Sequence, residues 1–301
     1  MNLAMIGLGR MGANMAQRLN KGGHEVVGYD PSPDARNKFE AEGLTSFASL
    51  ASVVGALPKP KILWLMVPAG KPVDETIAAL TPLLTKGDVI IDGGNSFYKD
   101  TMARAEMLRA KGIAYVDCGT SGGIWGLDVG YGMMIGGDDT VVKSLTPIFE
   151  ALAPAPDKGW GHVGPCGAGH FVKMVHNGIE YGLMQAYAEG FSVLKHKPDF
   201  KLDTHQVAEI WRYGTVIRSW LLDLAADALE KNPELDGIAP VVADSGEGRW
   251  TAFEAVELDV PAPIITLSLL ERIRSREKES FGDKLLAALR NEFGGHAITK
   301  E

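Results

Sequence analysis

The sequence predicts an α/β domain at the N-terminus followed by an all-α domain at the C-terminus. Short apolar runs alternate with amphipathic segments through the first half of the chain, and a glycine-rich loop directly follows the first run. The second half shows long helical periods without strand-like alternation. The 301 residues, 46% of them hydrophobic, can bury two cores, and we expect domains at residues 1–165 and 166–301.

The alternation places the elements of the N-terminal domain. Apolar runs predict strands at residues 3–6, 25–30, 62–67, 88–92, 114–118 and 132–137, with a short strand-like pair at 162–163. Amphipathic segments between them predict helices at 12–21, 33–42, 72–85 and 99–111. Strands and helices in this order are typical of a doubly wound parallel sheet.

The C-terminal domain is predicted to be helical throughout. Its helical periods cover residues 169–196, 204–214, 216–231, 264–279 and 281–293. Prolines mark the breaks between these segments, at Pro198, Pro233, Pro240, Pro261 and Pro263.

The segment GLGRMG fills the G-x-G-x-x-G pattern between the first strand and the first helix. The first glycine permits a tight turn, the second lets a pyrophosphate approach the backbone, and the third lets helix and strand pack closely. The helix N-terminus offers unpaired N–H groups to the phosphates. The N-terminal domain is therefore predicted to be a Rossmann-type dinucleotide-binding domain. The cofactor-binding residues of this loop are Gly7, Leu8, Gly9, Arg10, Met11 and Gly12.

Asp30, at the end of the second predicted strand, favours NAD over NADP. Its carboxylate can accept hydrogen bonds from the adenosine ribose and would repel a 2′-phosphate. Arg36 lies close enough in the sequence to offset that charge, so NADP stays open as a second cofactor.

Two loops that follow strands predict a ligand site at the C-terminal edge of the sheet. They are DGGNS at residues 92–96 and DCGTSGGIWG at 117–126. Successive small residues, such as Ser121, Gly122 and Gly123, can present several backbone N–H groups to one carboxylate or phosphate. Each loop can equally be no more than a tight turn.

The segment KMVHNGIEY places five polar side chains on one face of a helix with apolar flanks, namely Lys173, His176, Asn177, Glu180 and Tyr181. Lys173 and Glu180 could form a buried ion pair, but such pairs are often no more stable than apolar replacements. We therefore interpret this face as the wall of a ligand cleft. The apolar flanks are expected to hold the helix in the core.

Composition and charge exclude several classes of function. Thirty Lys and Arg against 38 Asp and Glu give a net charge of -8, which disfavours binding to nucleic acid or anionic membranes. No apolar run reaches the roughly 18 residues of a membrane span, and the N-terminus lacks a signal-peptide pattern, so a cytoplasmic location is expected. Cys118 and Cys166 are too few for a disulfide framework or a thiolate metal cage, and no metal is expected.

Four stretches together resemble the decarboxylating 6-phosphogluconate dehydrogenases, within the wider β-hydroxyacid dehydrogenases. They are GLGRMGANMAQRL, DGGNS, the run DCGTSGG followed by MMIGG, and GAGHFVKMVHNGIEYG. The likeness extends to the C-terminal RNEFGGH and covers nearly the whole chain; KMVHNGIEY is its most specific part. It implies oxidative decarboxylation of 6-phospho-D-gluconate to ribulose 5-phosphate and CO₂, within the pentose phosphate pathway or gluconate metabolism.

The resemblance also implies roles for individual residues. Lys173 becomes the general base and Glu180 the general acid. The nicotinamide side would be lined by Val67, Pro68, Ala69 and Asn95. The implied substrate contacts are Asn95, Ser121, Gly122, Gly123, His176, Asn177, Tyr181 and Arg272. Arg290 and His296 match a pair that reaches the substrate from a neighbouring subunit, which implies a homodimer or homotetramer.

Two features depart from the longer members of the family. Those members have a larger helical part, so this chain resembles a short form. Ser245 stands where they carry a substrate-contacting lysine, and Arg249 could supply that contact instead.

The chemistry of this reaction needs groups of these kinds. A base must take the proton of the C3 hydroxyl, and an acid must later protonate the enediol at carbon. The intermediate β-keto acid loses CO₂ without a metal, because a protonated lysine can stabilise the developing enolate.

Two other functions stay open from the sequence. A non-decarboxylating dehydrogenase of the 3-hydroxyisobutyrate type would keep Lys173 but would not need Glu180 as a proton donor. A nucleotide-sensing scaffold without catalysis would need only the glycine loop and Asp30.

Overall fold

The computed structural model describes residues 1–299, and the chain divides into two compact units, the first ending at Asn177 and the second beginning at Gly178. The first unit is built on an eight-stranded sheet in the order β3-β2-β1-β4-β5-β6-β7-β8. The strands are β1 (Asn2–Ile6), β2 (Glu25–Tyr29), β3 (Thr45–Phe47), β4 (Ile62–Leu65), β5 (Val89–Asp92), β6 (Ala114–Ser121), β7 (Gly132–Gly136) and β8 (Trp160–Gly164).

The first six strands are parallel, as the sequence predicts. Every predicted strand is present, and β3 is an addition, because its three residues are too few to show an alternating pattern. The order of the strands reverses between β1 and β4. This reversal is a topological switch point, which is where doubly wound folds bind their ligands.

The last two strands correct the prediction of a wholly parallel sheet. β7 is antiparallel to β6, and β8 is parallel to β7. Only residues 122–131, which include η2 (Gly123–Trp125) and α6 (Gly126–Val129), connect β6 to β7. A parallel crossover needs about a dozen residues or more, so this short connection returns the chain in the opposite direction.

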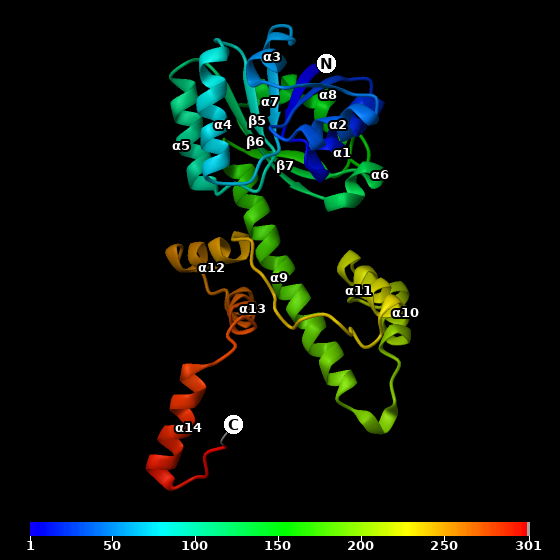
Figure 1. Ribbon diagram of the computed structural model, residues 1–301, viewed down its shortest axis with the longest axis vertical. Coiled ribbons are helices and arrows are strands. Elements are labelled where there is room, and N and C mark those ends of the chain that lie inside the picture. The colour runs from blue at the N-terminus through cyan, green and yellow to red at the C-terminus, as the bar shows by residue number, and fades with distance from the viewer. Residues whose placement is uncertain (300–301) are drawn as a thin grey trace. The chain divides into compact units, whose positions relative to one another are not determined.

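Helices cover both faces of the sheet (Figure 1). One face carries α1 (Arg10–Lys21), α2 (Pro33–Ala41), α7 (Asp139–Ser144) and α8 (Thr146–Leu152). The other carries α3 (Leu50–Gly55), α4 (Lys71–Leu80), which continues into η1 (Thr81–Leu83), and α5 (Tyr98–Arg109).

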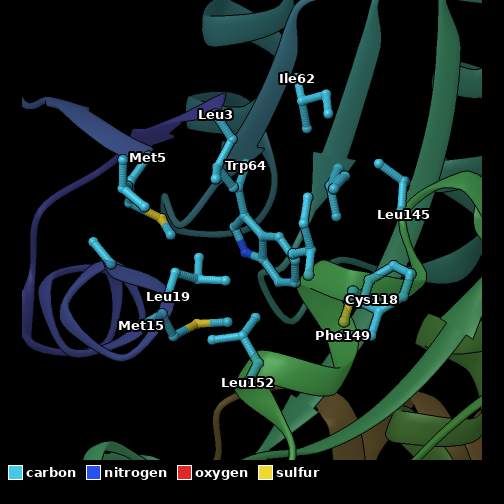
Figure 2. Close-up of a cluster of buried hydrophobic side chains, with 14 of the residues drawn as sticks. Leu3, Met5, Met15, Leu19, Ile62, Trp64, Cys118, Leu145, Phe149 and Leu152 are labelled. Carbon is cyan, nitrogen blue, oxygen red and sulfur yellow. The ribbon is translucent and has the colours of Figure 1, made fainter. Parts of the chain in front are cut away.

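Successive side chains of β1 point to opposite faces of the sheet and pack into two separate cores. Leu3 and Met5 belong to the cluster under α1 and α8, whereas Ala4 and Ile6 belong to the cluster under α3, α4 and α5. Figure 2 shows the first cluster around Trp64, whose ring meets that of Phe149 edge-on at a centroid distance of 6.2 Å. Burial on both faces explains why these strands read as continuous apolar runs.

Helix α9 (Ala168–Lys195) begins in the first unit and continues into the second. The buried carboxylate of Asp117, on β6, accepts hydrogen bonds from the N–H groups of Gly167 at 2.7 Å and His170 at 2.8 Å. These bonds satisfy donors that a helix N-terminus leaves without intrahelical partners. The first turns of α9 are therefore fixed to the sheet.

The described part of the second unit contains helices and no strands. Beyond α9 they are η3 (Pro198–Phe200), α10 (Thr204–Gly214), α11 (Trp220–Lys231), α12 (Glu247–Glu257), α13 (Pro263–Arg274) and α14 (Phe281–Gly294) (Figure 1). Helix α12 was not predicted, and α13 ends five residues before the predicted position at 279. Across residues 1–299, every helix is too short or too polar to cross a membrane.

The buried core of the second unit is small. Ala208, Leu222 and Ala226 form it, packed against side chains of α9, α10 and α11. The apolar flanks of KMVHNGIEY are buried only in part, because Met174 is 2% exposed but Ile179 is 53% and Leu183 45% exposed. Much of the apolar surface of this unit therefore lacks cover within one chain.

Candidate active site

The glycine loop between β1 and α1 has the geometry that its glycines predict. Gly7 has a φ of 98°, and a Cβ there would lie 2.4 Å from the carbonyl oxygen of Met66. A Cβ on Gly12 would lie 2.0 Å from the carbonyl oxygen of Gly7. At Gly9, by contrast, a Cβ would meet no other part of the described chain within 4 Å. Packing requires the first and third glycines, and the second leaves space for a pyrophosphate at the start of α1.

Asp30 is fixed beside this loop. One of its carboxylate oxygens accepts from the N–H of Leu8 at 2.8 Å, and the other accepts from the N–H of Ser32 at 2.8 Å. The guanidinium of Arg36 donates to the backbone carbonyls of Asp30 and Pro31, at 2.7 and 3.2 Å. Arg36 is therefore anchored to the backbone rather than to the Asp30 carboxylate.

A cleft of about 690 Å³ opens at the switch point, between the ends of β1 and β4. Its volume lies within the range of small-molecule and cofactor sites, about 300–1,000 Å³. Among the predicted cofactor residues, those that line it are Gly7, Gly9, Met11, Asp30, Val67, Pro68 and Asn95. Leu8 and Gly12 are buried beneath the loop, while Arg10 and Ala69 are exposed. The space at Gly9 and the placement of Asp30 fit a bound dinucleotide.

The DGGNS segment is a turn organised by its own first residue. The buried Asp92 carboxylate accepts from the N–H of Gly94 at 3.1 Å and from the hydroxyl of Ser96 at 2.7 Å. Asn95, between these two residues, lines the cleft. The segment is thus both a tight turn and part of the cleft wall, so the two interpretations are compatible.

The second small-residue loop leaves the end of β6. Ser121 is the last residue of the strand, and Gly122 and Gly123 have φ values of 131° and 50°. Residues with side chains rarely adopt these values, so the glycines allow the sharp turn into η2.

The first half of the KMVHNGIEY face comes together in the first unit. Lys173 is 5% exposed, and its Nζ lies 3.4 Å from Nδ1 of His176. The same Nδ1 lies 3.0 Å from Oδ1 of Asn177. A Cβ on Gly119 of β6 would lie 2.4 Å from Cβ of Lys173, so only glycine lets α9 approach the strand this closely. The lysine is therefore held against the strand that leads to Ser121.

In the second unit, Tyr181 contacts Arg272, another predicted substrate residue, and Ser245. Its hydroxyl accepts from the N–H of Ser245 at 3.2 Å, and the guanidinium of Arg272 lies over its ring, with Cζ 3.5 Å from the centroid. Arg272 also donates to the carbonyl of Ala243 at 2.9 Å. Glu180 precedes Tyr181 on α9 and is partly exposed.

Asp244 is a residue of this region that the sequence did not single out. It accepts hydrogen bonds from both Arg249 and Arg276, at 2.9 and 3.1 Å. The hydrogen bond from Arg249 is the main reason that the pKa of Asp244 is lowered. Arg249, which could replace the missing lysine, is thus already engaged by a carboxylate.

In the described part of the chain, two predicted substrate residues, Arg290 and His296, are not joined to Tyr181 and Arg272. Arg290 lies on α14 and His296 just after it, and both are exposed. Within residues 1–299, no hydrogen bond or ion pair joins either side chain to Tyr181 or Arg272. The described residues also contain no group of three or more His, Cys, Asp or Glu side chains that could hold a metal ion.

Two buried acids, Asp92 and Asp117, organise the site through hydrogen bonds that were not predicted from the sequence. Asp92 ends β5, Asp117 lies within β6, and the two residues are register partners on these neighbouring strands. An acid that is buried must be paired or hydrogen-bonded. An acidic residue within an apolar run that predicts a buried strand was therefore a signal that hydrogen-bond partners would be found nearby.

Comparison with known proteins identifies both halves of the chain. Residues 2–164 match the model of the NAD binding domain of 6-phosphogluconate dehydrogenase, and residues 169–292 match that of 6-phosphogluconate dehydrogenase, C-terminal domain. A Haloferax volcanii protein named as an NAD(+)-dependent, decarboxylating 6-phosphogluconate dehydrogenase is 45% identical over 302 residues, which cover 100% of this chain and 99% of the relative.

Longer relatives match over part of their length. A Bacillus subtilis protein of the same name is 40% identical over 291 residues, covering 92% of this chain and 62% of the relative. The solved structure of Plasmodium falciparum 6-phosphogluconate dehydrogenase aligns with a TM-score of 0.84 at 28% identity, covering 100% of this chain and 66% of that one. The chain thus spans less than two thirds of these longer relatives.

The glycine loop allows a paired test of cofactor binding. Gly9→Ala should raise the dissociation constant for NADH at least about tenfold, because its methyl group occupies the space for the pyrophosphate. Its stability should change by no more than about 1 kcal/mol, since the conformation at Gly9 suits alanine. Gly12→Ala should instead destabilise the unit by about 1–3 kcal/mol through overpacking.

NADH fluorescence titration and thermal unfolding would measure these two effects. Unchanged NADH affinity in Gly9→Ala would show that the pyrophosphate does not bind at this loop.

Proposed function

Since the chain belongs to the 6-phosphogluconate dehydrogenase family, we propose that it oxidises 6-phospho-D-gluconate with NAD⁺ as the preferred acceptor and releases ribulose 5-phosphate and CO₂. The observation that carries the proposal is the buried Lys173 beside His176, in a chain whose glycine loop and Asp30 fit a dinucleotide. We further propose that residues 1–165 form the dinucleotide domain and residues 166–301 the substrate and oligomerisation domain.

Different residues around the cleft are proposed to bind different parts of the cofactor. Bound NAD⁺ would supply the hydride acceptor. The N-terminus of α1 and the space at Gly9 accommodate the pyrophosphate, and Asp30 accepts hydrogen bonds from the adenosine ribose. A dinucleotide crosses the switch point, so its nicotinamide half belongs on the opposite side of β1, beside Val67, Pro68 and Asn95.

Lys173 is the proposed general base that takes the proton of the C3 hydroxyl. A lysine can act as a base only in its neutral form, and burial disfavours the charged form. His176 lies beside the amine and Asn177 beside His176, so the pair can orient both the amine and the substrate. Ser121, Gly122 and Gly123 are the proposed contacts of the carboxylate that leaves as CO₂.

The second half of the reaction needs a different donor. Once protonated, Lys173 can donate a hydrogen bond to the enolate oxygen that develops as CO₂ leaves. Glu180 lies seven positions after Lys173 on α9, which is two turns along one continuous helix. It is the proposed acid that protonates the enediol at carbon.

Arg272 is the proposed main contact of the phosphate. Its guanidinium is oriented by the ring of Tyr181 and the carbonyl of Ala243, so little freedom is lost when it binds an anion. Arg249 shares the carboxylate of Asp244 with Arg276, which offsets part of its charge. We therefore infer that Arg249 contributes less to phosphate binding than Arg272 does.

The exposed apolar surface of the second unit supports a homodimer or homotetramer. Phe253 and Leu267 are more than half exposed, and Phe293, on α14, is 95% exposed. Exposed apolar surface of this extent marks a protein interface. We propose that a second copy covers it and that Arg290 and His296 reach the substrate of the neighbouring subunit.

The activity can be tested with purified protein, 6-phosphogluconate and either NAD⁺ or NADP⁺. We expect NADH and CO₂ in equal amounts, because the β-keto acid is consumed as it forms. NADH without CO₂ would instead indicate a non-decarboxylating hydroxyacid dehydrogenase, and the absence of both would rule out the proposed activity.

Lys173→Met should lower kcat by at least about a thousandfold while NADH affinity stays within about twofold. The matched control is Lys195→Met, near the end of the same helix, which should retain full activity.

Asp30→Asn tests how the chain distinguishes the two cofactors. The variant keeps an oxygen for the N–H of Leu8 but loses the charge that repels a 2′-phosphate. The ratio of kcat/KM for NAD⁺ over that for NADP⁺ should fall about tenfold, which corresponds to about 1.4 kcal/mol. Asp34→Asn, on the exposed surface of α2, should leave the ratio unchanged. If Asp30→Asn left the ratio of the two kcat/KM values unchanged, a group other than Asp30 would distinguish NAD⁺ from NADP⁺.

The assembly can be tested by sedimentation equilibrium of the full chain. We expect a mass of two or four chains, because the apolar surface of the second unit needs a partner. Phe293→Asp should shift the distribution toward monomers, and Glu292→Gln, at the adjacent position, should not. A wild-type chain that sediments as a monomer at micromolar concentration would contradict the proposal.

A further inference from the structure

We propose that Arg104, which lies outside the cofactor cleft, is a positioning residue that holds the two loops on the nicotinamide side together and so sets the affinity for that half of the dinucleotide. The inference rests on the proposed position of the nicotinamide. Arg104 lies on α5 and lines a separate hollow between α4 and α5.

The guanidinium group of Arg104 contacts three residues from two other segments of the first unit. Its Nε donates to the carboxylate of Asp74 at 2.7 Å, and Nη2 donates to the carbonyl of Gly70 at 3.3 Å. Its Nη1 lies 3.9 Å from the carboxylate of Asp92. Arg104 itself is only 5% exposed. It therefore joins the start of α4 and the end of β5 from within the helical layer.

The segments that Arg104 joins are the ends of the cleft-lining loops. Gly70 is the N-cap of α4 and closes the loop that contains Val67 and Pro68. Asp92 begins the loop that contains Gly94 and Asn95. The two loops are in contact, since a Cβ on Gly94 would lie 3.2 Å from the carbonyl oxygen of Val67. A shift of either end would therefore change the wall that faces the nicotinamide.

The positive charge of Arg104 also helps to offset the cost of burying the Asp92 carboxylate. Asp92 has no exposed surface, and beyond its own loop it accepts a hydrogen bond from the hydroxyl of Tyr115 at 2.9 Å. Burial, followed by the charge of Asp92, raises the pKa of Tyr115, so its hydroxyl stays a donor. Burial alone would lower the pKa of Arg104, but Asp74, Tyr115 and Asp92 raise it, and the guanidinium stays charged.

Lysine could not take over this role. Its ammonium is a compact charge on a flexible chain, whereas the guanidinium is a rigid fork with donors on several sides. Lysine could keep a bond to Asp74, the partner nearest to the surface, but could not reach Gly70 and Asp92 at the same time. The two loops would then be positioned independently.

The effect should be confined to one half of the cofactor. The guanidinium of Arg104 contacts Gly70, Asp74 and Asp92. None of these residues belongs to the glycine loop, which serves the pyrophosphate, and none is Asp30, which serves the adenosine ribose. ADP-ribose contains that half of the cofactor and lacks the nicotinamide. Comparing NADH with ADP-ribose therefore separates a positioning effect from general damage to the unit.

The experiment measures dissociation constants for NADH and ADP-ribose by titration calorimetry of the full chain. In Arg104→Lys and Arg104→Gln, the constant for NADH should rise about tenfold, and that for ADP-ribose should stay within about twofold. Arg109→Lys is the matched control, because Arg109 lies on the exposed side of the same helix and pairs with Glu106. It should leave both constants unchanged.

Asp74→Asn provides an independent variant if the loss of Arg104 prevents folding. Asp74 is 59% exposed, so its replacement loosens the guanidinium without opening the core, and it should weaken NADH binding selectively and to a smaller extent. Equal weakening of both ligands, or a lowered Tm with unchanged NADH affinity, would overturn the proposal. Binding is measured without 6-phosphogluconate, so a failure of the proposed turnover would not affect this result.

Discussion

The bond between the Asp117 carboxylate and the first turn of α9 determines where the proposed catalytic helix lies. A buried carboxylate is costly unless it is hydrogen-bonded, and here two backbone N–H groups satisfy it. Glycines make room for this arrangement, since a Cβ on Gly136 would lie 2.5 Å from the carboxylate. Because the start of α9 is fixed, Lys173 is held against Gly119 of the adjacent strand.

Two buried acids on neighbouring strands, Asp92 at the end of β5 and Asp117 within β6, have different partners. Asp92 accepts hydrogen bonds from Gly94 and Ser96 of its own loop and from Tyr115, so it fixes the DGGNS turn to the neighbouring strand. Asp117 binds atoms 50 and 53 positions later, so the lysine is positioned by a long-range contact. Burial and the charge of Asp117 together raise the pKa of the Cys166 thiol, which therefore stays protonated.

The second unit exposes much apolar surface that the chain itself does not cover. Its buried core cluster consists only of Ala208, Leu222 and Ala226 among the described residues, while large apolar side chains of α12, α13 and α14 are exposed. A helix whose apolar residues are covered by another copy has the same periodicity as one covered by its own chain. For this reason the apolar flanks of KMVHNGIEY were assigned to a core within the chain, although Ile179 and Leu183 are exposed in it.

The sequence by itself determined the features that depend on neighbouring residues. The glycine loop could be recognised because steric limits act at fixed spacing, and Asp30 because it ends the next strand. The alternating runs located seven of the eight strands, and helical spacing placed Lys173, His176 and Asn177 on one face. Each of these inferences uses contacts along one element or between consecutive elements.

Only the tertiary structure decided the features that depend on distant residues. The carboxylate of Asp117 accepts from N–H groups 50 and 53 positions later, and this pairing fixes the start of α9 to β6. Arg104 reads as an ordinary charged helix residue, yet it joins partners 30 and 34 positions away. Such contacts arise when the strands assemble side by side, and no local pattern in the sequence records which distant side chains then become neighbours.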